Sequence, residues 1–300
     1  MRTLHRRKQR TTCLTFSPTG HELAVGGRVG PEDGRVDVWE LTGGDKPVTL
    51  PSLSGPPWGL AFTPGGGLAV ALPDQVVLCS GHRFRAAEVI CEWGSGEYTT
   101  PSLAPDGCRV AVDTRSLLRL IDLRPPFAEV WSHPVSAERV TPGRAAFSPD
   151  GRHLAVKGGH TVEVREAATG LRVGSFGPPS PTDRWFGSRL LWSPDGRWVC
   201  EVWQQWVNVW DAASGACVFQ RVARSEWIND AAFHPTSGRL AIAIAGRSDG
   251  AVRFHSPGLW QEAAAFAWPV GRVGSVAFST DGTLAAAGGD RPEVVVWDMD

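Results

Sequence analysis

The chain contains 300 residues, of which 30 are lysine or arginine and 31 are aspartate or glutamate, so its formal net charge is −1. This balance gives no long-range attraction for nucleic acid or an anionic membrane surface. No apolar run approaches the roughly 18 residues of a membrane span, and the charged first ten residues have no apolar run behind them, which predicts no signal peptide. We therefore expect neither nucleic acid nor a membrane as a partner.

The residues that most often carry chemistry are scattered. Six cysteines occur singly, with no Cys-x-x-Cys pair, and a chain of this size does not need disulfides, so we expect buried thiols in a cytoplasmic protein. The eight histidines never fall at ligand spacing from one another or from a cysteine, which argues against a metal site. Neither a nucleophile elbow nor a phosphate-binding loop occurs. We expect no cofactor.

One turn motif recurs seven times along the chain: an apolar residue, a small residue, in most copies a proline, and a glycine. The apolar anchors are Phe16, Phe62, Leu103, Phe147, Trp192, Phe233 and Phe278. Their spacing of 41 to 46 residues is typical of four-stranded propeller blades. Seven such units occupy nearly the whole chain, which predicts a single domain over residues 1–300.

Each unit contains further strand signals in a fixed order. A short apolar run follows each turn, too short and too rich in small residues for a helix, at 23–25, 68–70, 110–112, 154–156, 199–200, 240–242 and 284–286. A strand with period-two alternation comes next, at 36–39, 76–79, 118–121, 162–165, 207–210, 252–255 and 294–297. Weaker fourth strands are predicted at 88–90, 129–131, 171–173, 217–219 and 264–266. Such small sheets are marginal alone and must stack on their neighbours.

The two ends of the chain predict how the seven units form a closed ring. The seventh unit stops at Trp297, directly after its third strand, while residues 2–5 ahead of the first anchor are spare. Pairing this N-terminal segment with the last unit would remove two exposed strand edges. The predicted fold is therefore an all-β, seven-bladed propeller of four-stranded antiparallel blades, closed by its N-terminal strand and monomeric.

This order of turn, apolar strand and strand ending in Trp-Asp resembles the WD40-repeat family over essentially the whole chain. The dipeptides at 210–211 and 297–298 match the family fully, and that at 39–40 matches in part. Family members often carry a Gly-His pair whose imidazole joins a hydroxyl, an aspartate and the tryptophan in a buried tetrad. No unit here has that pair, and the hydroxyl position corresponds to Val25, Val70, Val112, Val156, Ile242 and Ala286. We expect apolar packing in place of the tetrad, because a half-satisfied polar network is worse than none.

Glu201 is an exception, since it stands at the hydroxyl position of the fifth unit. A buried carboxylate needs a partner, and the expected one is an arginine such as Arg189 or Arg197. The alternative is a shift of register by one residue, which would turn Glu201 outward and Val202 inward. The sequence leaves both open.

The resemblance implies a non-catalytic scaffold that binds a protein or peptide on one loop face. In similar propellers, the residues six and four positions before each anchor point to that face. These are Arg10 and Thr12, Pro56 and Trp58, Glu97 and Thr99, Thr141 and Gly143, Phe186 and Ser188, Trp227 and Asn229, and Arg272 and Gly274. Aromatic side chains beside arginine are typical of binding hot spots. The alternative is that each aromatic packs against a neighbouring loop.

Loop length narrows the expected contact area. From the anchor to the end of the third strand the distance is 17 to 19 residues in five units, but 23 in the first and 22 in the sixth. The longer loops, 26–34 and 245–250, flank the seventh unit in a closed ring. Our candidate partner-binding residues are Arg10, Trp58, Phe186, Trp227, Asn229, Arg272, Asp290 and Arg291, centred on units six, seven and one. A second candidate is the Pro-rich loop 177–187.

Two other function classes remain open for a propeller: an enzyme, or a small-ligand or glycan sensor, either of which would use the mouth of the central channel. The inner-strand positions are aliphatic or alanine, which leaves little to act as acid, base or nucleophile. We therefore expect no catalysis.

Overall fold

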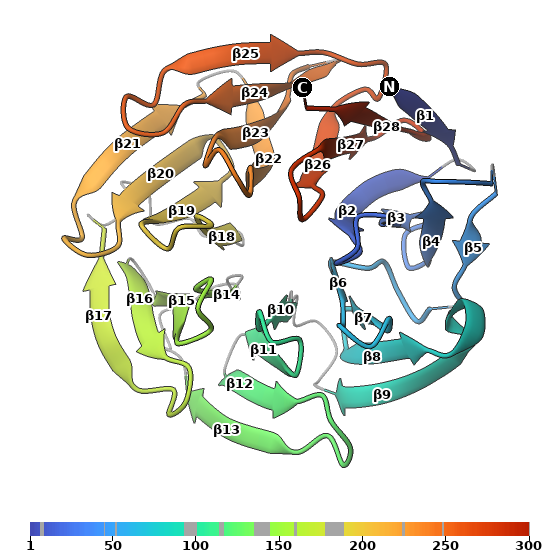
Figure 1. Ribbon diagram of the computed structural model, residues 1–300, viewed down its shortest axis with the longest axis horizontal. Coiled ribbons are helices and arrows are strands. Elements are labelled where there is room, and N and C mark those ends of the chain that lie inside the picture. Colours follow the sequence, from blue (N-terminus) through green and yellow to red (C-terminus); the bar gives the residue numbers. More distant parts are fainter. Residues whose placement is uncertain are drawn as a thin grey trace.

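A computed structural model describes residues 1–6, 9–44, 46–51, 53–92, 101–113, 117–134, 145–158, 161–177, 189–223, 226–247 and 249–299. Within these ranges, 28 strands form seven four-stranded antiparallel sheets. Figure 1 shows the sheets arranged as blades of a ring around a central channel. The predicted all-β, seven-bladed propeller is confirmed.

The strands follow one another outward from the channel in six blades, and the last blade takes its outermost strand from the N-terminus. Blades 1 and 2 contain β2 (Arg10–Phe16), β3 (Glu22–Arg28), β4 (Gly34–Glu40), β5 (Val48–Thr49), β6 (Gly59–Phe62), β7 (Leu68–Ala71), β8 (Gln75–Ser80) and β9 (Ala86–Glu92). Blades 3 and 4 contain β10 (Pro101–Leu103), β11 (Arg109–Asp113), β12 (Leu117–Asp122), β13 (Glu129–Pro134), β14 (Ala146–Phe147), β15 (His153–Gly158), β16 (Thr161–Glu166) and β17 (Arg172–Phe176). Blades 5 and 6 contain β18 (Arg189–Trp192), β19 (Trp198–Trp203), β20 (Trp206–Asp211), β21 (Cys217–Val222), β22 (Trp227–Phe233), β23 (Leu240–Ala245), β24 (Gly250–His255) and β25 (Glu262–Phe266). Blade 7 contains β26 (Val273–Phe278), β27 (Leu284–Gly289), β28 (Glu293–Asp298) and β1 (Arg2–His5). A short 3₁₀ helix, η1 (His82–Phe84), precedes β9.

The repeated turn has a clear physical basis, which blade 4 illustrates. The Ser148 hydroxyl donates to Asp150 Oδ1 at 2.6 Å and accepts a hydrogen bond from the His153 backbone N–H at 2.9 Å. Gly151 follows with φ +69°, a left-handed conformation that favours glycine. This turn reverses the chain between the first and second strands of the blade. We call the end of the ring that carries these turns the turn face, and the opposite end, where each first strand begins, the entry face.

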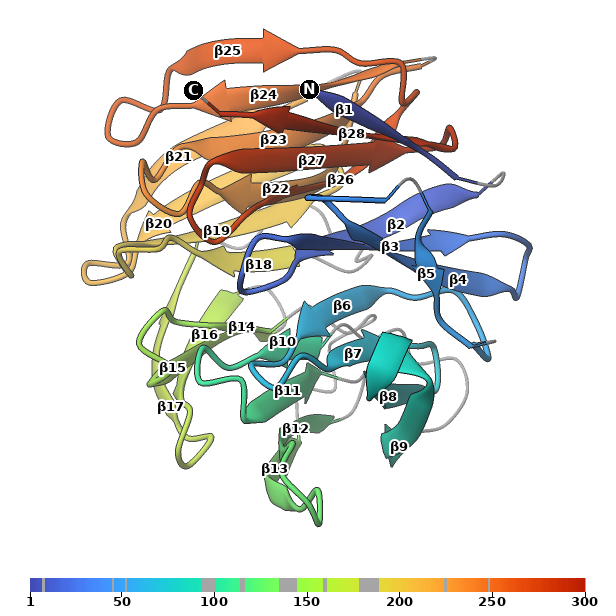
Figure 2. The ribbon, with the colours of Figure 1, turned by 45° about the vertical axis from the view of Figure 1, so that its right-hand side comes forward.

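The N-terminal strand closes the ring as predicted. β1 pairs antiparallel with β28, with Arg2 opposite Val296 and Leu4 opposite Val294. Both termini consequently lie in blade 7, and β1 runs beside β28 in both views of the molecule (Figures 1 and 2). Leu4 is buried in a cluster that includes Leu14 of blade 1 and Val294 of blade 7, so the closing strand also joins two blades.

The family's tetrad is replaced by apolar packing, as expected. The equivalent side chains Val25, Val70, Val112, Val156 and Ile242 are fully buried among aliphatic neighbours. In blade 7 the equivalent residue is Ala287 rather than Ala286, because Ala287 lies opposite Val295 just as Val25 lies opposite Asp37. Within the described residues, the indole N–H groups of Trp39 and Trp210 are buried without a hydrogen-bond partner.

Blades 7 and 1 approach each other closely through glycine. A Cβ placed on Gly274 of β26 would lie 2.6 Å from the Thr11 carbonyl oxygen of β2, and one on Gly288 would lie 2.7 Å from Thr11 Oγ1. Only a residue without a side chain fits at such distances. Among the described residues, the structure contains no helix long and apolar enough to cross a membrane.

Candidate functional site

Of the two predicted aromatic side chains that the structure describes, Trp227 is more exposed than Trp58. It is the first residue of β22 on the entry face, and 53% of its surface is accessible to solvent. Its backbone is fixed by pairing with Ala245 in the neighbouring strand. The packed alternative is therefore wrong for Trp227, which presents an indole to solvent on a rigid strand end.

Arg272 and Asp290 form an ion pair beside the entry to β26. Arg272 Nε donates to Asp290 Oδ2 at 2.8 Å, and the Arg272 backbone N–H donates to Asp290 Oδ1 at 2.9 Å. Burial opposes ionisation of Asp290, but the hydrogen bonds and charge of Arg272, with a further contribution from the charge of Arg10, hold the pKa of this carboxyl below its ordinary value. Two of the predicted residues, Arg272 and Arg10, therefore act on the carboxylate of a third, Asp290.

Arg291 belongs to the same group of side chains. A Cβ placed on Gly271 would meet both Asp290 Oδ1 and Arg291 Cγ, so the two neighbouring side chains border the same glycine. Arg10 and Arg291 are both exposed, and Arg28 lies directly opposite Arg10 in the adjacent strand. We call Arg10, Trp227, Arg272, Asp290 and Arg291 together the blade 6–7–1 surface.

The other three predicted residues have different environments. Asn229 is partly buried and donates from Nδ2 to the Val273 carbonyl oxygen at 2.6 Å, so it links the entry ends of β22 and β26. Trp58 is partly buried and lines the central channel rather than the blade 6–7–1 surface. Phe186 lies outside the described residues, as does the predicted Pro-rich loop beyond Gly177.

The two lengthened loops are only partly as predicted. The loop of blade 6 agrees, since β23 ends at Ala245 and β24 begins at Gly250. The loop of blade 1 is shorter than expected: β3 continues through Gly26 and Gly27 to Arg28, and the chain leaves the sheet only over residues 29–33. The glycine pair belongs to a strand that packs close to its neighbour, not to a turn.

The predicted partners of Glu201 are wrong. Glu201 is buried as expected for the unshifted register, but its Oε1 pairs with Lys157 Nζ of blade 4 at 2.6 Å, and the two side chains are 6% and 9% exposed. Arg189 instead pairs with Asp230, and the exposed Arg197 pairs with the partly buried Asp211 at 3.7 Å. Val202 is also buried, so the alternative of an outward Glu201 is wrong as well.

Asp230 is a structural residue that the sequence patterns did not reveal. Its carboxylate is buried, pairs with Arg189 of blade 5, and accepts hydrogen bonds from Ser275 Oγ at 2.6 Å and the Val276 N–H at 3.1 Å in blade 7. One side chain therefore joins three blades. The sequence feature that could have revealed this role is a carboxylate within an inner strand, but a single sequence does not show which neighbours face it.

A second buried carboxylate, Asp37, fixes the N-terminal segment to blade 1. It accepts hydrogen bonds from Gln9 Nε2 at 2.9 Å, Arg35 Nε at 2.8 Å and Thr49 Oγ1 at 2.8 Å, and from Arg6 Nε at 3.5 Å. Burial lowers the pKa of Arg6 to about 10, against the opposing effect of the Asp37 charge. This arrangement satisfies a charge that would be costly alone, and we interpret it as structural.

The central channel contains a cavity of about 430 Å³. Its described lining is mainly aliphatic and aromatic, with Cys13, Ser102 and Arg189 among the few polar side chains. Arg189 is held by Asp230 and Ser102 Oγ accepts the Phe147 N–H. No carboxylate or imidazole belongs to the described part of this lining.

Comparison with known proteins agrees with this architecture. The profile of the family described as WD domain, G-beta repeat matches residues 1–40 and 268–298, which span β1 to β4 and the three C-terminal strands of blade 7. Among solved structures, the β-propeller domain of Myceliophteria thermophila Cps50 (Swd1) is similar, with a TM-score of 0.75 over 99% of this chain and 98% of that chain, at 17% sequence identity. The family-model match supports the resemblance stated from the repeat motifs over these two segments, and the solved structure supports the propeller fold.

Proposed function

We propose that this chain, a seven-bladed β-propeller of the WD40-repeat type, acts as a non-catalytic scaffold that binds a protein or peptide partner on the blade 6–7–1 surface. The observation that carries the proposal is the half-exposed indole of Trp227 on the same face as a group of arginines. Large aromatic side chains and arginine are the residue types that most often dominate binding energy at protein interfaces.

The charges of this surface indicate what the partner should offer. Arg10, Arg272 and Arg291 surround a single carboxylate, that of Asp290, so the group has an excess of positive charge. An acidic side chain of the partner would gain charge-assisted hydrogen bonds here, while an apolar side chain would cover Trp227. We therefore propose a partner segment that combines an apolar and an acidic residue.

The test is a comparison of what co-purifies with the wild-type protein and with the double variant Trp227→Ala and Arg272→Ala. Removing an exposed aromatic and the arginine beside Asp290 should lower recovery of a specific partner by about tenfold or more, because hot-spot truncations commonly cost that much. Quantitative mass spectrometry of the purified complexes measures the loss.

A control variant separates a specific effect from general damage. Leu259 is 80% exposed and lies in the turn between β24 and β25, at the turn-face end of the blade that carries Trp227. Leu259→Ala should leave partner recovery unchanged. Equal recovery with the double variant would contradict the proposed surface, and turnover of a small molecule that survives the double substitution would contradict the non-catalytic assignment.

We also propose a reducing, cytoplasmic location. All six cysteines are free, and Cys13, Cys79, Cys91 and Cys200 are buried, which suits thiols that contribute packing rather than cross-links. Fractionation of cells that express a tagged chain tests the location directly.

A further inference from the structure

A groove of about 870 Å³ opens between blades 4 and 5 on the turn face, away from the blade 6–7–1 surface. Its walls include Phe176 and Val164 of blade 4 and Trp192 and Ala212 of blade 5. The Trp192 indole N–H donates to the Ala146 carbonyl oxygen at 3.0 Å, which holds this side chain in place. The groove therefore has walls that combine apolar and polar side chains, and Trp192 is held rigidly in one of them.

The groove lies beside a glycine of the outer strand of blade 4. In blade 4, Gly174 of β17 lies opposite Val164. The equivalent residues of the two neighbouring blades are aromatic: Trp131 lies opposite Leu120 in blade 3, and Phe219 lies opposite Val209 in blade 5. A Cβ placed on Gly174 would meet nothing within 4 Å. Blade 4 thus leaves open the space that its neighbours fill.

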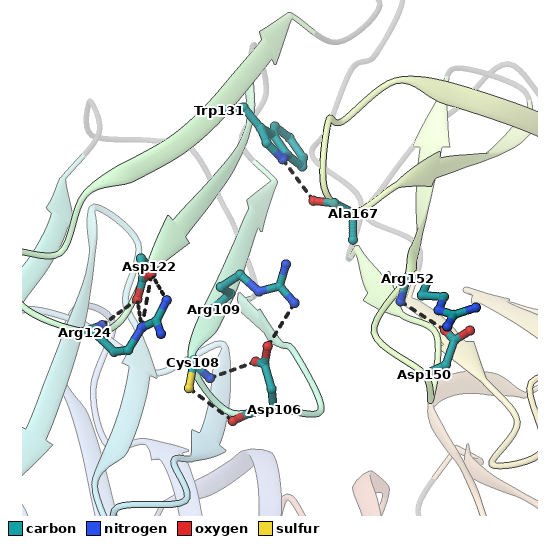
Figure 3. Close-up of polar contacts among 9 residues, drawn as sticks. All are labelled: Asp106, Cys108, Arg109, Asp122, Arg124, Trp131, Asp150, Arg152 and Ala167. Carbon is teal, nitrogen blue, oxygen red and sulfur yellow. Dashed lines mark hydrogen bonds and ion pairs between the residues drawn. The ribbon is translucent and has the colours of Figure 1, made fainter.

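The neighbouring blades show how such a space is filled. Trp131 packs against the core of blade 4, and its Nε1 donates to the Ala167 carbonyl oxygen at 3.1 Å (Figure 3). Phe219 extends in the same way to blade 6, where its ring stacks on Trp260 with centroids 5.5 Å apart. An aromatic side chain that reaches across to the next blade is therefore what fits this position.

The groove contains a carbonyl group equivalent to the one that accepts the Trp131 indole N–H in blade 4. Ala167 is fixed by a hydrogen bond from its N–H to the Arg152 carbonyl oxygen at 2.7 Å, and Ala212 makes the same bond to Arg197 at 2.8 Å. The two alanines therefore occupy equivalent positions in blades 4 and 5. Ala212 lines the groove, where its carbonyl oxygen corresponds to the acceptor of the Trp131 indole.

The charged groups that line the groove favour an occupant with a positive charge. Asp150 and Asp195, from the repeated turns of the two blades, both line it, and no lysine or arginine belongs to its described lining, where His153 is the one imidazole. Hydrogen bonds from the Ser148 hydroxyl and the Arg152 N–H lower the pKa of Asp150, so it is ionised at neutral pH. A cationic side chain would complement these carboxylates.

We propose that the groove between blades 4 and 5 is a second docking site, which takes a tryptophan side chain from an extended segment of a partner protein with an arginine next to that tryptophan. The tryptophan would occupy the space beside Gly174, and the arginine would meet Asp150 and Asp195. This site is independent of the blade 6–7–1 surface, because it lies on the other face of the ring and at other blades.

The probe is a short fluorescein-labelled peptide with a central Arg-Trp pair flanked by glycine and serine, titrated with the whole protein and followed by fluorescence anisotropy. Replacing its tryptophan by alanine should weaken binding by about tenfold or more, and replacing its arginine by glutamate should weaken it further. Equal binding of the tryptophan and alanine peptides, or no binding of the Arg-Trp peptide, overturns the proposal.

A variant of the protein itself can fill the groove with one of its own side chains. Gly174→Trp restores the aromatic residue of the neighbouring blades at a position with no steric conflict, so it should abolish peptide binding while leaving the melting temperature equal or higher. Gly43→Trp is the control, because Gly43 also faces open space but lies between β4 and β5 of blade 1; it should bind the peptide normally. Unchanged binding by Gly174→Trp overturns the proposed position.

A second variant tests peptide binding in the groove even if Gly174→Trp folds poorly. Asp150→Asn with Asp195→Asn removes both charges and keeps an oxygen that can accept the hydrogen bonds of the turn. This variant should lose the preference for arginine over glutamate in the peptide and keep the preference for tryptophan over alanine. A preserved preference for arginine would contradict the role of the two carboxylates.

Discussion

At the scale of single residues, Lys157 and Glu201 illustrate how the blades depend on one another. Their charged atoms are 2.6 Å apart in an almost fully buried environment. A buried pair adds little stability over well-packed apolar residues, but loss of one partner exposes the other to an uncompensated desolvation cost. The pair therefore affects the stability of the protein mainly when one of its partners is removed.

We expect Glu201→Gln to lower the free energy of unfolding by about 3 kcal/mol, because the Lys157 ammonium would lose its buried counter-charge. Urea denaturation followed by circular dichroism measures the change. The double variant Lys157→Met and Glu201→Leu should lose much less than the single variant. The exposed pair of Arg124 with Asp122 provides a control, since Arg124→Ala should leave the unfolding midpoint unchanged.

The sequence predicted that Glu201 needs a partner but not which one. The expected arginines are near in the chain, whereas Lys157 lies in the preceding blade. Contacts within a strand or hairpin follow from spacing, but contacts between blades depend on the angle at which sheets stack. The same reason explains why Asp230 was missed, because its partners lie in the two neighbouring blades.

At the scale of elements, the apolar runs and the period-two alternation predicted strands where they occur, because both signals come from residues that are local in the chain. The glycine pair at 26–27, which was predicted to lie in a loop, was misplaced for a different reason. Gly26 and Gly27 allow β3 to run close to its neighbours, and close approach and turn formation both favour glycine. A sequence alone does not separate the two causes.

Gly274 tests this packing between blades 7 and 1. We expect Gly274→Ala to destabilise the protein by about 1–3 kcal/mol, because its Cβ would fall 2.6 Å from the Thr11 carbonyl oxygen and force the two blades apart. Thermal unfolding followed by circular dichroism provides the measurement. Gly174→Ala is the matched control in another strand, and its melting temperature should stay the same or rise, since nothing lies near its Cβ. Equal effects of the two substitutions would contradict this account of blade contact.

At the scale of the whole molecule, stability depends on a closed ring. Leu4 is buried at the junction of β1 with blades 7 and 1. We expect Leu4→Ala to cost about 3 kcal/mol, as is usual for a large-to-small change in a core, and to shift the entire unfolding transition when denaturation is followed by both circular dichroism and tryptophan fluorescence. Thr3→Ala on the same strand is the control and should change little. A separate early transition limited to blade 7 would contradict a cooperative ring.

Closure also has a consequence for how the ring folds. β1 pairs with β28, although the other blades lie between these two strands along the chain. Contacts between such distant parts of a chain slow folding. Until they form, β28 presents an unpaired edge, and the β1 strand of another copy could occupy it in place of the chain's own. Newly made protein at high concentration should therefore exchange N-terminal strands between copies, and rapid dilution during refolding should favour the monomer.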